Sequence, residues 1–349
     1  MGAIRIDERL AAACKPSVLR EPELILQADD LLVLCAGFEE RSVAWLRRLV
    51  QSGSRRFSVL VCEYHPAVPQ NRGGEVRALI AEADGRLLSM PYSREEPAGA
   101  GERVLEAARG MRGRTWVDIS GMSRLLIVQI VVAAFEARMT VPTLLYAEAA
   151  AYPPSQSDVE TAAQGGDDPV DTALFLSSGV FEVTIVPELS SVAMQGQPIR
   201  LVAFPSFNAH QMLALRSEIQ ASYWTFVNGV PPSERNRWRM EALRQLNRVD
   251  SIPLPVREEF EASTLRYEET LGVLLSVYAA HGSLERILVA PTGSKMQSVA
   301  VGVFRGALSD VQIVYPTPRA FLNPSRFTLG VEALYSLDVE PLRLEIGPG

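Results

Sequence analysis

The chain has 349 residues, of which 47% are hydrophobic and 21% are charged, and its formal net charge is −7. This length exceeds one ordinary domain and fits two domains of roughly 150–170 residues, each apolar enough to form its own core. The acidic balance disfavours non-specific binding along a DNA or RNA backbone, so we expect no extended nucleic-acid interface, although a local basic pocket is compatible with it.

Cysteine and histidine are too few to build a zinc site. Cys14, Cys35 and Cys62 form no CxxC pair, and the sequence has only three histidines. Cys35 and Cys62 lie in apolar, strand-like runs, so we interpret them as reduced core residues, which is typical of a cytoplasmic protein. The charged N-terminus is unlike a signal peptide, and the apolar run Leu125–Phe135 is too short to cross a bilayer. We therefore expect no metal, no cofactor and no membrane partner.

The first half, residues 31–190, follows an N-terminal lead-in of residues 1–30 and alternates apolar strands with helices. Uniformly apolar strands are typical of a buried parallel sheet. A polar segment rich in Pro and Gly, Tyr152–Pro169, predicts a surface loop, and Phe181–Pro187 alternates like a strand. The expected core strands of this half are Leu31–Cys35, Phe57–Glu63, Arg86–Met90, Thr115–Ile119 and Thr143–Tyr146.

The second half, residues 199–349, repeats this alternation. Strands that alternate with helices indicate right-handed crossovers and a doubly wound sheet, so the predicted fold class is α/β with two Rossmann-like halves. A long helix is expected over Phe260–His281, and the tail Leu334–Leu344 is a candidate terminal strand. The other expected extended segments are Arg200–Phe204, Tyr223–Val227, Ser251–Leu254, Ile287–Ala290 and Gln312–Tyr315.

The two halves also resemble each other in sequence, which predicts an internal duplication. VDISGMSRLLIVQIVVAAF (residues 117–135) aligns with VAPTGSKMQSVAVGVFRGA (residues 289–307) when Gly121 is matched to Gly293. Two further blocks keep the same order: residues 31–49 match 201–219, and residues 144–155 match 313–325. A fixed long-period repeat of this kind is the sequence signature of a repeated structural unit.

The turn Thr292-Gly293-Ser294-Lys295 is the strongest candidate for ligand binding. It joins an apolar strand to a helix, and the first N–H groups of a helix point outward at the positive end of its dipole. Such an end binds anions, a glycine lets a phosphate approach the backbone, and Lys295 adds a positive charge. The alternative, an ordinary strand–helix turn with a solvated lysine, stays open, because one glycine turn is weak evidence.

Further candidates follow the carboxyl ends of strands, where open parallel sheets bind ligands. The loop Gly37–Ser42 carries two carboxylates and one guanidinium, and its alternative reading is a plain helix start. Glu39, Glu40, Arg41 and Asp118 are candidates for acid–base and phosphate contacts. Tyr152 and Phe321 are candidates for stacking on a base or for anchoring loops. The remaining predicted ligand-binding residues are Gly37, Phe38, Ser120, Gly121, Ser123, Arg124, Ser206, Phe207, Asn208, Thr292, Gly293, Ser294 and Lys295.

Several common site motifs are absent from the sequence. Neither half has GxGxxG after its first strand, which argues against an NAD or FAD site. The chain also lacks GxxxxGK[ST] and GxSxG, so neither a P-loop NTPase nor a hydrolase elbow is supported.

Thr292-Gly293-Ser294-Lys295-Met296, at the fourth strand of a Rossmann-like half, resembles the TGGTK-type motif of the CRISPR-associated Rossmann fold (CARF) and its tandem relative, the SAVED domain. Ser120-Gly121-Met122-Ser123-Arg124 resembles a degenerate copy. The second glycine of the motif is Ser294 here, and the first half lacks the lysine. The resemblance implies a cleft between the two halves that binds a nucleotide or cyclic oligonucleotide messenger in prokaryotic antiviral defence. It also implies a separate effector chain.

Two alternatives to this sensor stay open at the level of sequence. The carboxylates and the guanidinium of the first half would suit an enzyme that cleaves or modifies a nucleotide, including a ring-nuclease-like activity. The third reading is a protein-interaction subunit with a vestigial pocket. Measured nucleotide binding and measured product formation separate these three hypotheses.

Overall fold

A computed structural model describes residues 4–5, 24–164, 179–320, 327–339 and 345–346. The chain divides into two compact units. Unit 1 comprises Met1–Lys15, Pro154–Asn323 and Pro341–Gly349, and unit 2 comprises Pro16–Pro153 and Pro324–Glu340. Among the described residues, no helix is both long and apolar enough to cross a membrane.

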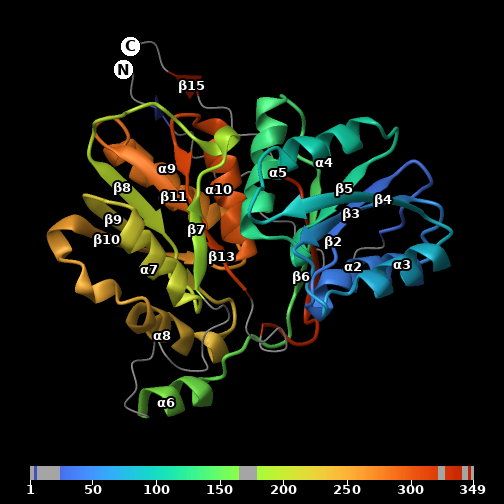
Figure 1. Ribbon diagram of the computed structural model, residues 1–349, viewed down its shortest axis with the longest axis horizontal. Coiled ribbons are helices and arrows are strands. Elements are labelled where there is room, and N and C mark those ends of the chain that lie inside the picture. The colour runs from blue at the N-terminus through green and yellow to red at the C-terminus, as the bar shows by residue number, and fades with distance from the viewer. Residues whose placement is uncertain (1–3, 6–23, 165–178, 321–326, 340–344, 347–349) are drawn as a thin grey trace. The chain divides into compact units, whose positions relative to one another are not determined.

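Unit 2 is built on a six-stranded sheet in the order β14-β6-β5-β2-β3-β4 (Figure 1). Five strands are parallel and β14 is antiparallel to β6. In chain order the parallel strands follow the Rossmann arrangement 3-2-1-4-5. The strands are β2 (Leu31–Cys35), β3 (Ser58–His65), β4 (Arg86–Ser93), β5 (Thr115–Asp118), β6 (Thr143–Glu148) and β14 (Ala333–Leu337).

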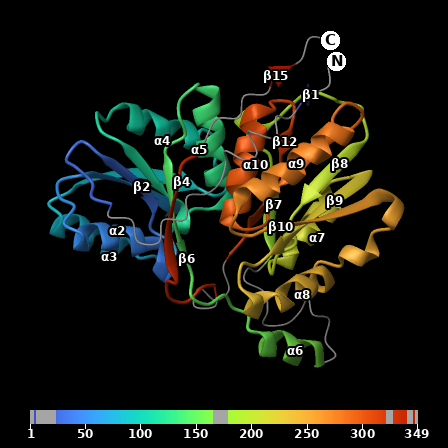
Figure 2. The same ribbon diagram turned by 180° about the vertical axis from the view of Figure 1, so that it is seen from behind.

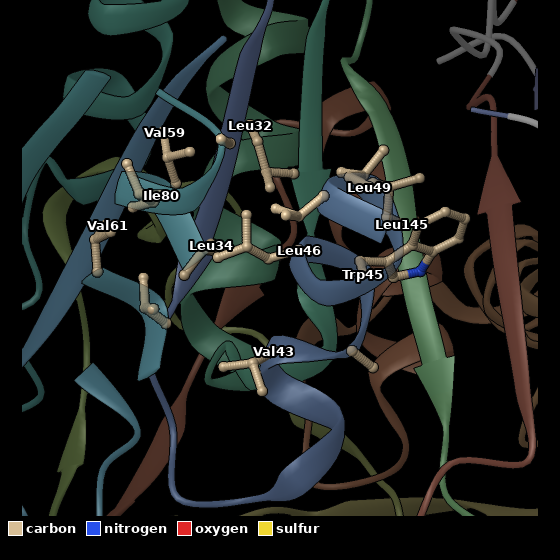
Figure 3. Packing of buried hydrophobic residues seen from close by; sticks show 14 of the residues in the cluster. Leu32, Leu34, Val43, Trp45, Leu46, Leu49, Val59, Val61, Ile80 and Leu145 are labelled. Carbon is tan, nitrogen blue, oxygen red and sulfur yellow. The ribbon is translucent and has the colours of Figure 1, made fainter. Parts of the chain in front are cut away.

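Helices cover both faces of this sheet, α2 and α3 on one face and α4 and α5 on the other (Figure 1). They are α2 (Ala44–Gln51), α3 (Gly73–Glu82), α4 (Ala100–Arg109) and α5 (Arg124–Glu136), with the short 3-10 helices η1 (Glu40–Val43) and η2 (Ile119–Gly121). Because side chains alternate along a strand, Leu32 and Leu34 face α2 and pack on the fully buried Trp45 and Leu46 (Figure 3). Leu145 of β6 joins the same cluster.

Unit 1 contains a parallel sheet in the order β10-β9-β8-β11-β12, which in chain order is again 3-2-1-4-5. Leu201, Trp224 and Leu288 of this sheet pack with Met212 of α7. Figure 2 shows α9 and α10 in front of the sheet. The strands are β8 (Ile199–Ala203), β9 (Tyr223–Val230), β10 (Arg257–Ser263), β11 (Arg286–Ala290) and β12 (Gln312–Ile313); the helices are α6 (Gln156–Gln164), α7 (Ala209–Glu218), α8 (Trp238–Leu246), α9 (Tyr267–His281) and α10 (Lys295–Ala307).

The remaining elements of unit 1 are small. The strands β7 (Val180–Thr184) and β13 (Tyr315–Pro318) form an antiparallel ribbon, and β1 (Ile4–Arg5) pairs with β15 (Glu345–Ile346). The short 3-10 helices are η3 (Pro187–Leu189), η4 (Glu234–Asn236), η5 (Val249–Ser251) and η6 (Leu254–Val256).

The predicted α/β fold class is confirmed: parallel sheets alternate with helices in both units. The shared strand order is common among unrelated doubly wound proteins, so the internal duplication stays a prediction.

Two predicted elements of the second half have different bounds in the structure. The helix expected over Phe260–His281 begins only at Tyr267, because the residues before it form β10 and pair along their whole length with β9. Phe260 and Ala262 alternate with glutamates, which is strand periodicity that the longer helical pattern concealed. The extended segment expected over Ser251–Leu254 is shorter, because Ile252 and Pro253 have extended backbone while Ser251 ends η5 and Leu254 begins η6.

The boundaries of the units also differ from the predicted halves. Strand β7 lies in the range given to the first half but pairs with β13 of unit 1, and β14 lies in the range given to the second half but completes the sheet of unit 2. The predicted loop Tyr152–Pro169 contains α6, and its last residues lie outside the described part of the chain.

Candidate functional site

The strand order fixes where a ligand site is expected in each unit. In a doubly wound sheet, ligands bind beyond the carboxyl ends of the strands, where the strand order reverses. That switch point lies between β2 and β5 in unit 2 and between β8 and β11 in unit 1. The four predicted site segments follow these four strands, so each pair of segments shares one edge of one sheet.

In unit 2 one of the two glycines of the site segments, Gly121, is needed for packing. A Cβ on Gly121 would stand 2.2 Å from the backbone oxygen of Cys35 and 2.9 Å from Cβ of Ser42. Gly37 is less confined, since its nearest neighbour, the oxygen of Gly121, would lie 3.6 Å away. The hydroxyl of Ser42 donates to the backbone oxygens of Gly37 and Glu39. The β5–η2 turn is thus packed directly against the end of β2.

The polar residues after β5 shape this turn. Asp118 is fully buried, and its Oδ1 accepts a hydrogen bond from the backbone N–H of Ser120 at 2.9 Å. The hydroxyl oxygen of Ser120 accepts from the N–H of Ala147 on β6 at 2.8 Å, and Ser123 caps α5 through the N–H of Leu126. Arg124, the first residue of α5, is partly exposed. Through these contacts Asp118, Ser120 and Ser123 stabilise the turn and the start of α5. Their predicted roles in binding or catalysis stay predictions.

Arg41 lies buried beneath this edge of the sheet rather than facing solvent. Its Nη1 donates to the hydroxyl of Tyr146 at 3.1 Å, and its Nη2 lies 3.3 Å from both carboxylate oxygens of Glu39. The rings of Tyr146 and Tyr152 also lie within cation–π distance of the guanidinium. Burial lowers the pKa of Arg41, but Glu39, Tyr146 and Tyr152 together outweigh burial and raise the pKa above its usual value, so the residue stays charged. Glu40, the other predicted carboxylate, is exposed.

The C-terminal segment of unit 2 contacts the loop that carries these groups. Phe38 packs edge-to-face on Phe327 at a centroid distance of 4.9 Å, and Thr328 donates to Glu39. Tyr335 on β14 stacks on Tyr146 and donates to Glu148. The predicted ligand residues Phe38 and Glu39 therefore have partners inside their own unit.

Two residues of this edge were missed by the sequence analysis. Tyr64 follows the predicted strand in β3 and donates from its hydroxyl to the oxygen of Gly121 at 2.9 Å. Tyr92 of β4 shares a hydrogen bond of 2.9 Å with Ser123. The rings of Tyr64 and Tyr92 pack edge-to-face. Both tyrosines stand just beyond predicted strand ends, which is the signal that would have identified them.

In unit 1, Thr292 ties the two strands of the switch point together. Its side chain is 1% exposed, and its hydroxyl donates to the oxygen of Phe204 at 2.7 Å while accepting from the N–H of Phe204 at 3.2 Å. A Cβ on Gly293 would stand 2.9 Å from Cβ of Phe204 and 2.3 Å from Oε1 of Gln297. The absence of a side chain at Gly293 thus lets the turn pack on the end of β8.

Helix α10 begins with a capping box. Ser294 accepts from the N–H of Gln297 at 3.1 Å, and Oε1 of Gln297 accepts from the N–H of Ser294 at 2.8 Å. The hydroxyl of Ser294 also donates to the oxygen of Thr264, just beyond β10. The first-turn amides that this box does not use belong to Lys295 and Met296, and the side chain of Lys295 is partly exposed.

Gln297 has a polar group that the capping box does not use. Its side chain is 2% exposed, and its Nε2 has no hydrogen-bond partner among the described residues. A Cβ built on Gly229 would stand 3.7 Å from this nitrogen. The atom nearest to that Cβ would be Cγ2 of Thr264, at 2.7 Å. The amide therefore lies where the ends of β9, β10 and β11 converge. A buried amide donor without an acceptor is costly, and such a group calls for an explanation.

The three predicted residues after β8 lie partly beneath α8. Phe207 is 6% exposed and packs with Trp238, while the guanidinium of Arg239 stands 4.3 Å from the centre of its ring. Ser206 exchanges hydrogen bonds with Asn247, and Asn208 is buried at the start of α7. Phe321 lies outside the described residues.

No group of three or more His, Cys, Asp or Glu side chains able to hold a metal ion occurs in the described part of the chain.

No family model matches the sequence, and no curated protein matches it. Solved structures to which this chain is weakly similar include a functionally unknown protein from Pseudomonas aeruginosa PAO1, with 10% identity, 82% of this chain and 92% of that chain covered, and a TM-score of 0.23. The cytoplasmic domain of a prokaryotic cation chloride cotransporter has 11% identity, coverage of 82% and 94%, and a TM-score of 0.24. A universal stress protein from Archaeoglobus fulgidus has 9% identity, coverage of 83% and 97%, and a TM-score of 0.23. Similarity this low carries no argument about function.

Proposed function

We propose that the protein is a sensor that binds a nucleotide or cyclic oligonucleotide, and that unit 1 holds an anionic part of this ligand at the carboxyl edge of its sheet. The site centres on the start of α10, beside the switch point between β8 and β11. Lys295 supplies charge, the positive end of the helix dipole adds to it, and Gln297 supplies a directed donor.

The buried amide of Gln297 is the observation that carries this proposal. Its Nε2 has no acceptor among the described residues, although its Oε1 is engaged in the capping box and the hydroxyl of Thr292 is hydrogen-bonded to Phe204. An acceptor oxygen of a ligand would satisfy it, and the gain is large because the amide has already lost its water. Tight packing at Gly293 means that the ligand would meet the amides of the first helical turn rather than the glycine.

The resemblance of residues 292–296 to the CARF and SAVED motif supports a cyclic oligonucleotide as the ligand and antiviral defence as the setting. Under that proposal a separate effector chain reads the bound state. The enzymatic alternative is less favoured in unit 2, because Asp118 caps a turn in the core and Glu39 pairs with the buried Arg41. An Asp118→Ala variant tests it: product formation from nucleotides that depends on Asp118 would favour the enzyme.

The test is calorimetric titration of the full chain with a panel of mononucleotides and cyclic di-, tri- and tetranucleotides. Gln297→Glu keeps an acceptor for the N–H of Ser294 but removes the donor, so binding of a phosphate ligand should be lost. Glu241→Gln, on the exposed side of α8, is the matched control and should bind normally. Folded wild-type protein that binds no nucleotide of the panel would overturn the proposal.

A further inference from the structure

A buried arginine gathers polar partners at the amino edge of the sheet of unit 1, opposite the edge proposed for the ligand. Arg200, the second residue of β8, is 4% exposed. Its Nε donates to Oε2 of Glu285 at 2.6 Å, while its Nη1 donates to the hydroxyl of Thr225 at 3.1 Å and lies 3.1 Å from Oε2 of Glu258. Its Nη2 donates to Oε1 of Glu285 at 3.3 Å and lies 3.3 Å from Nδ1 of His281. The guanidinium thus joins β8 to β9, to β10 and to the end of α9.

His281, the last residue of α9, connects this arginine to both carboxylates. Its Nε2 lies 3.1 Å from Oε1 of Glu258. Its Nδ1 lies 3.4 Å from Oε1 of Glu285, besides its contact with Arg200. The side chain is 22% exposed, so the ring can exchange protons with water although the arginine beside it is buried.

The other titratable and charged groups of the elements packed around His281 have contacts of their own. Along β10, Arg257, Glu259 and Glu261 alternate with Glu258 and so project from the other face of the strand. The remaining groups are Tyr223, whose ring lies 5.1 Å from the guanidinium of Arg200; Tyr278 of α9, which donates to Asp310; Arg286 of β11, which donates to Gln312; and Arg305 of α10, which donates to the backbone of Glu188 and Ser190.

These contacts assign one tautomer to the neutral ring of His281. A guanidinium only donates hydrogen bonds, so Nδ1 must carry no proton if it is to accept from Nη2 of Arg200. The proton is then on Nε2, which donates to the carboxylate of Glu258. In this state every N–H group of Arg200 has an acceptor, as the N–H groups of buried side chains generally do.

We propose that His281 is a proton-operated switch that controls the contacts of Arg200. When Nδ1 takes up a proton from water, it becomes a donor and turns from Arg200 to Oε1 of Glu285. Nη2 of Arg200 then loses one acceptor, and two cations face each other between two carboxylates. No other bond forms or breaks. Because Arg200 joins three neighbouring elements of unit 1, the proton changes how the amino edge of this sheet is held together.

The test is nuclear magnetic resonance of the full-length wild-type chain with ¹⁵N-labelled histidine and arginine. His65→Gln and His210→Gln assign the ring of His281 by elimination. At pH 8 the spectrum should show His281 with its proton on Nε2 and a bare Nδ1. Acidification to pH 5 should protonate Nδ1, since this is the range in which histidine ordinarily changes charge. A proton on Nδ1 at pH 8, or a bare Nδ1 at pH 5, would overturn the proposal.

His281→Gln is the matched variant, because an amide can accept from Arg200 and donate to Glu258 without taking up a proton. In the wild type, the Nε–H signal of Arg200 should shift between pH 8 and pH 5 in step with the ring of His281. The shift should be lost in His281→Gln and kept in His210→Gln. An Arg200 signal that moves equally in the wild type and in folded His281→Gln would show that His281 does not control the arginine.

Discussion

The hydroxyl of Thr328 donates a 2.8 Å hydrogen bond to Oε1 of Glu39, although 289 residues separate the two in sequence. Beside it, Phe327 packs on Phe38. The chain thus leaves unit 2 at Pro153, forms most of unit 1, and then returns to unit 2, where it contacts the loop after β2. This relationship gives the C-terminal segment a defined contribution to the stability of unit 2.

Thr328→Val should lower the free energy of unfolding by about 1.5–3 kcal/mol, because the lost hydrogen bond has a charged acceptor in a partly buried place. A double-mutant cycle with Glu39→Gln measures the coupling between the two side chains by chemical denaturation. Additive effects of the two substitutions would show that this contact does not fasten the segment.

Arg41→Met should destabilise the protein by about 3–5 kcal/mol, because it leaves the carboxylate of Glu39, which is only 12% exposed, without its cation. The matched control is Arg56→Met, which breaks an ion pair with Asp84 in which both side chains are more than half exposed. Such a surface pair contributes little, so the control should unfold at nearly the wild-type denaturant concentration. Similar midpoints for both variants would contradict the buried role of Arg41.

Gly121→Ala should be far more harmful than Gly37→Ala. The new Cβ at position 121 would stand 2.2 Å from the backbone oxygen of Cys35, and backbone cannot move aside as a flexible side chain can. At position 37 the closest atoms would lie 3.6 Å away, which is an ordinary contact. Overpacking of this kind typically costs about 1–3 kcal/mol or more, and thermal melts of the two variants measure the difference. Equal melting temperatures would be inconsistent with the described turn.

Lys295→Ala should weaken a phosphorylated ligand by about 10- to 150-fold, since a charged hydrogen bond contributes roughly 1.5–3 kcal/mol. Stability should change little, because the side chain is partly exposed at the start of α10. Calorimetric titration and a melt on the same sample decide the point. Intact binding together with a lower melting temperature would mean that Lys295 is a structural residue.

Alkaline pH should destabilise the protein through Tyr146. Burial raises the pKa of this tyrosine well above its usual value near 10, and Tyr152 raises it further. Because the folded pKa exceeds the unfolded one, the stabilising contribution is complete below about pH 10 and is lost as pH rises beyond it, by up to about 1.4 kcal/mol per pH unit. Denaturation series at about pH 9 and pH 11 should show a smaller loss of stability for Tyr146→Phe. An unchanged pH dependence would argue against this source.

The local sequence pattern determined much of the fold. Uniformly apolar runs such as Leu31–Cys35 and Ile287–Ala290 suit a sheet that is covered on both faces. They therefore predict parallel strands with helices between them. The candidate site segments were predicted for the same reason, since the carboxyl ends of such strands share one edge of the sheet. Both steps depend only on periodicity and chain direction, which a sequence carries locally.

Tertiary structure decided what those segments contact. No residue near Glu39 in the sequence indicates its hydrogen bond with Thr328. Likewise, no residue near Cys35 indicates that Cys62 and Met90 follow it in register across the sheet. Pairing with β9 makes the residues of β10 a strand, although their sequence pattern had been interpreted as helical. Pairing with β6 places β14 in unit 2. Whether a polar side chain near a strand end meets a ligand or a neighbour depends on such long-range packing, and for Asp118 and Arg41 the neighbours are inside the protein.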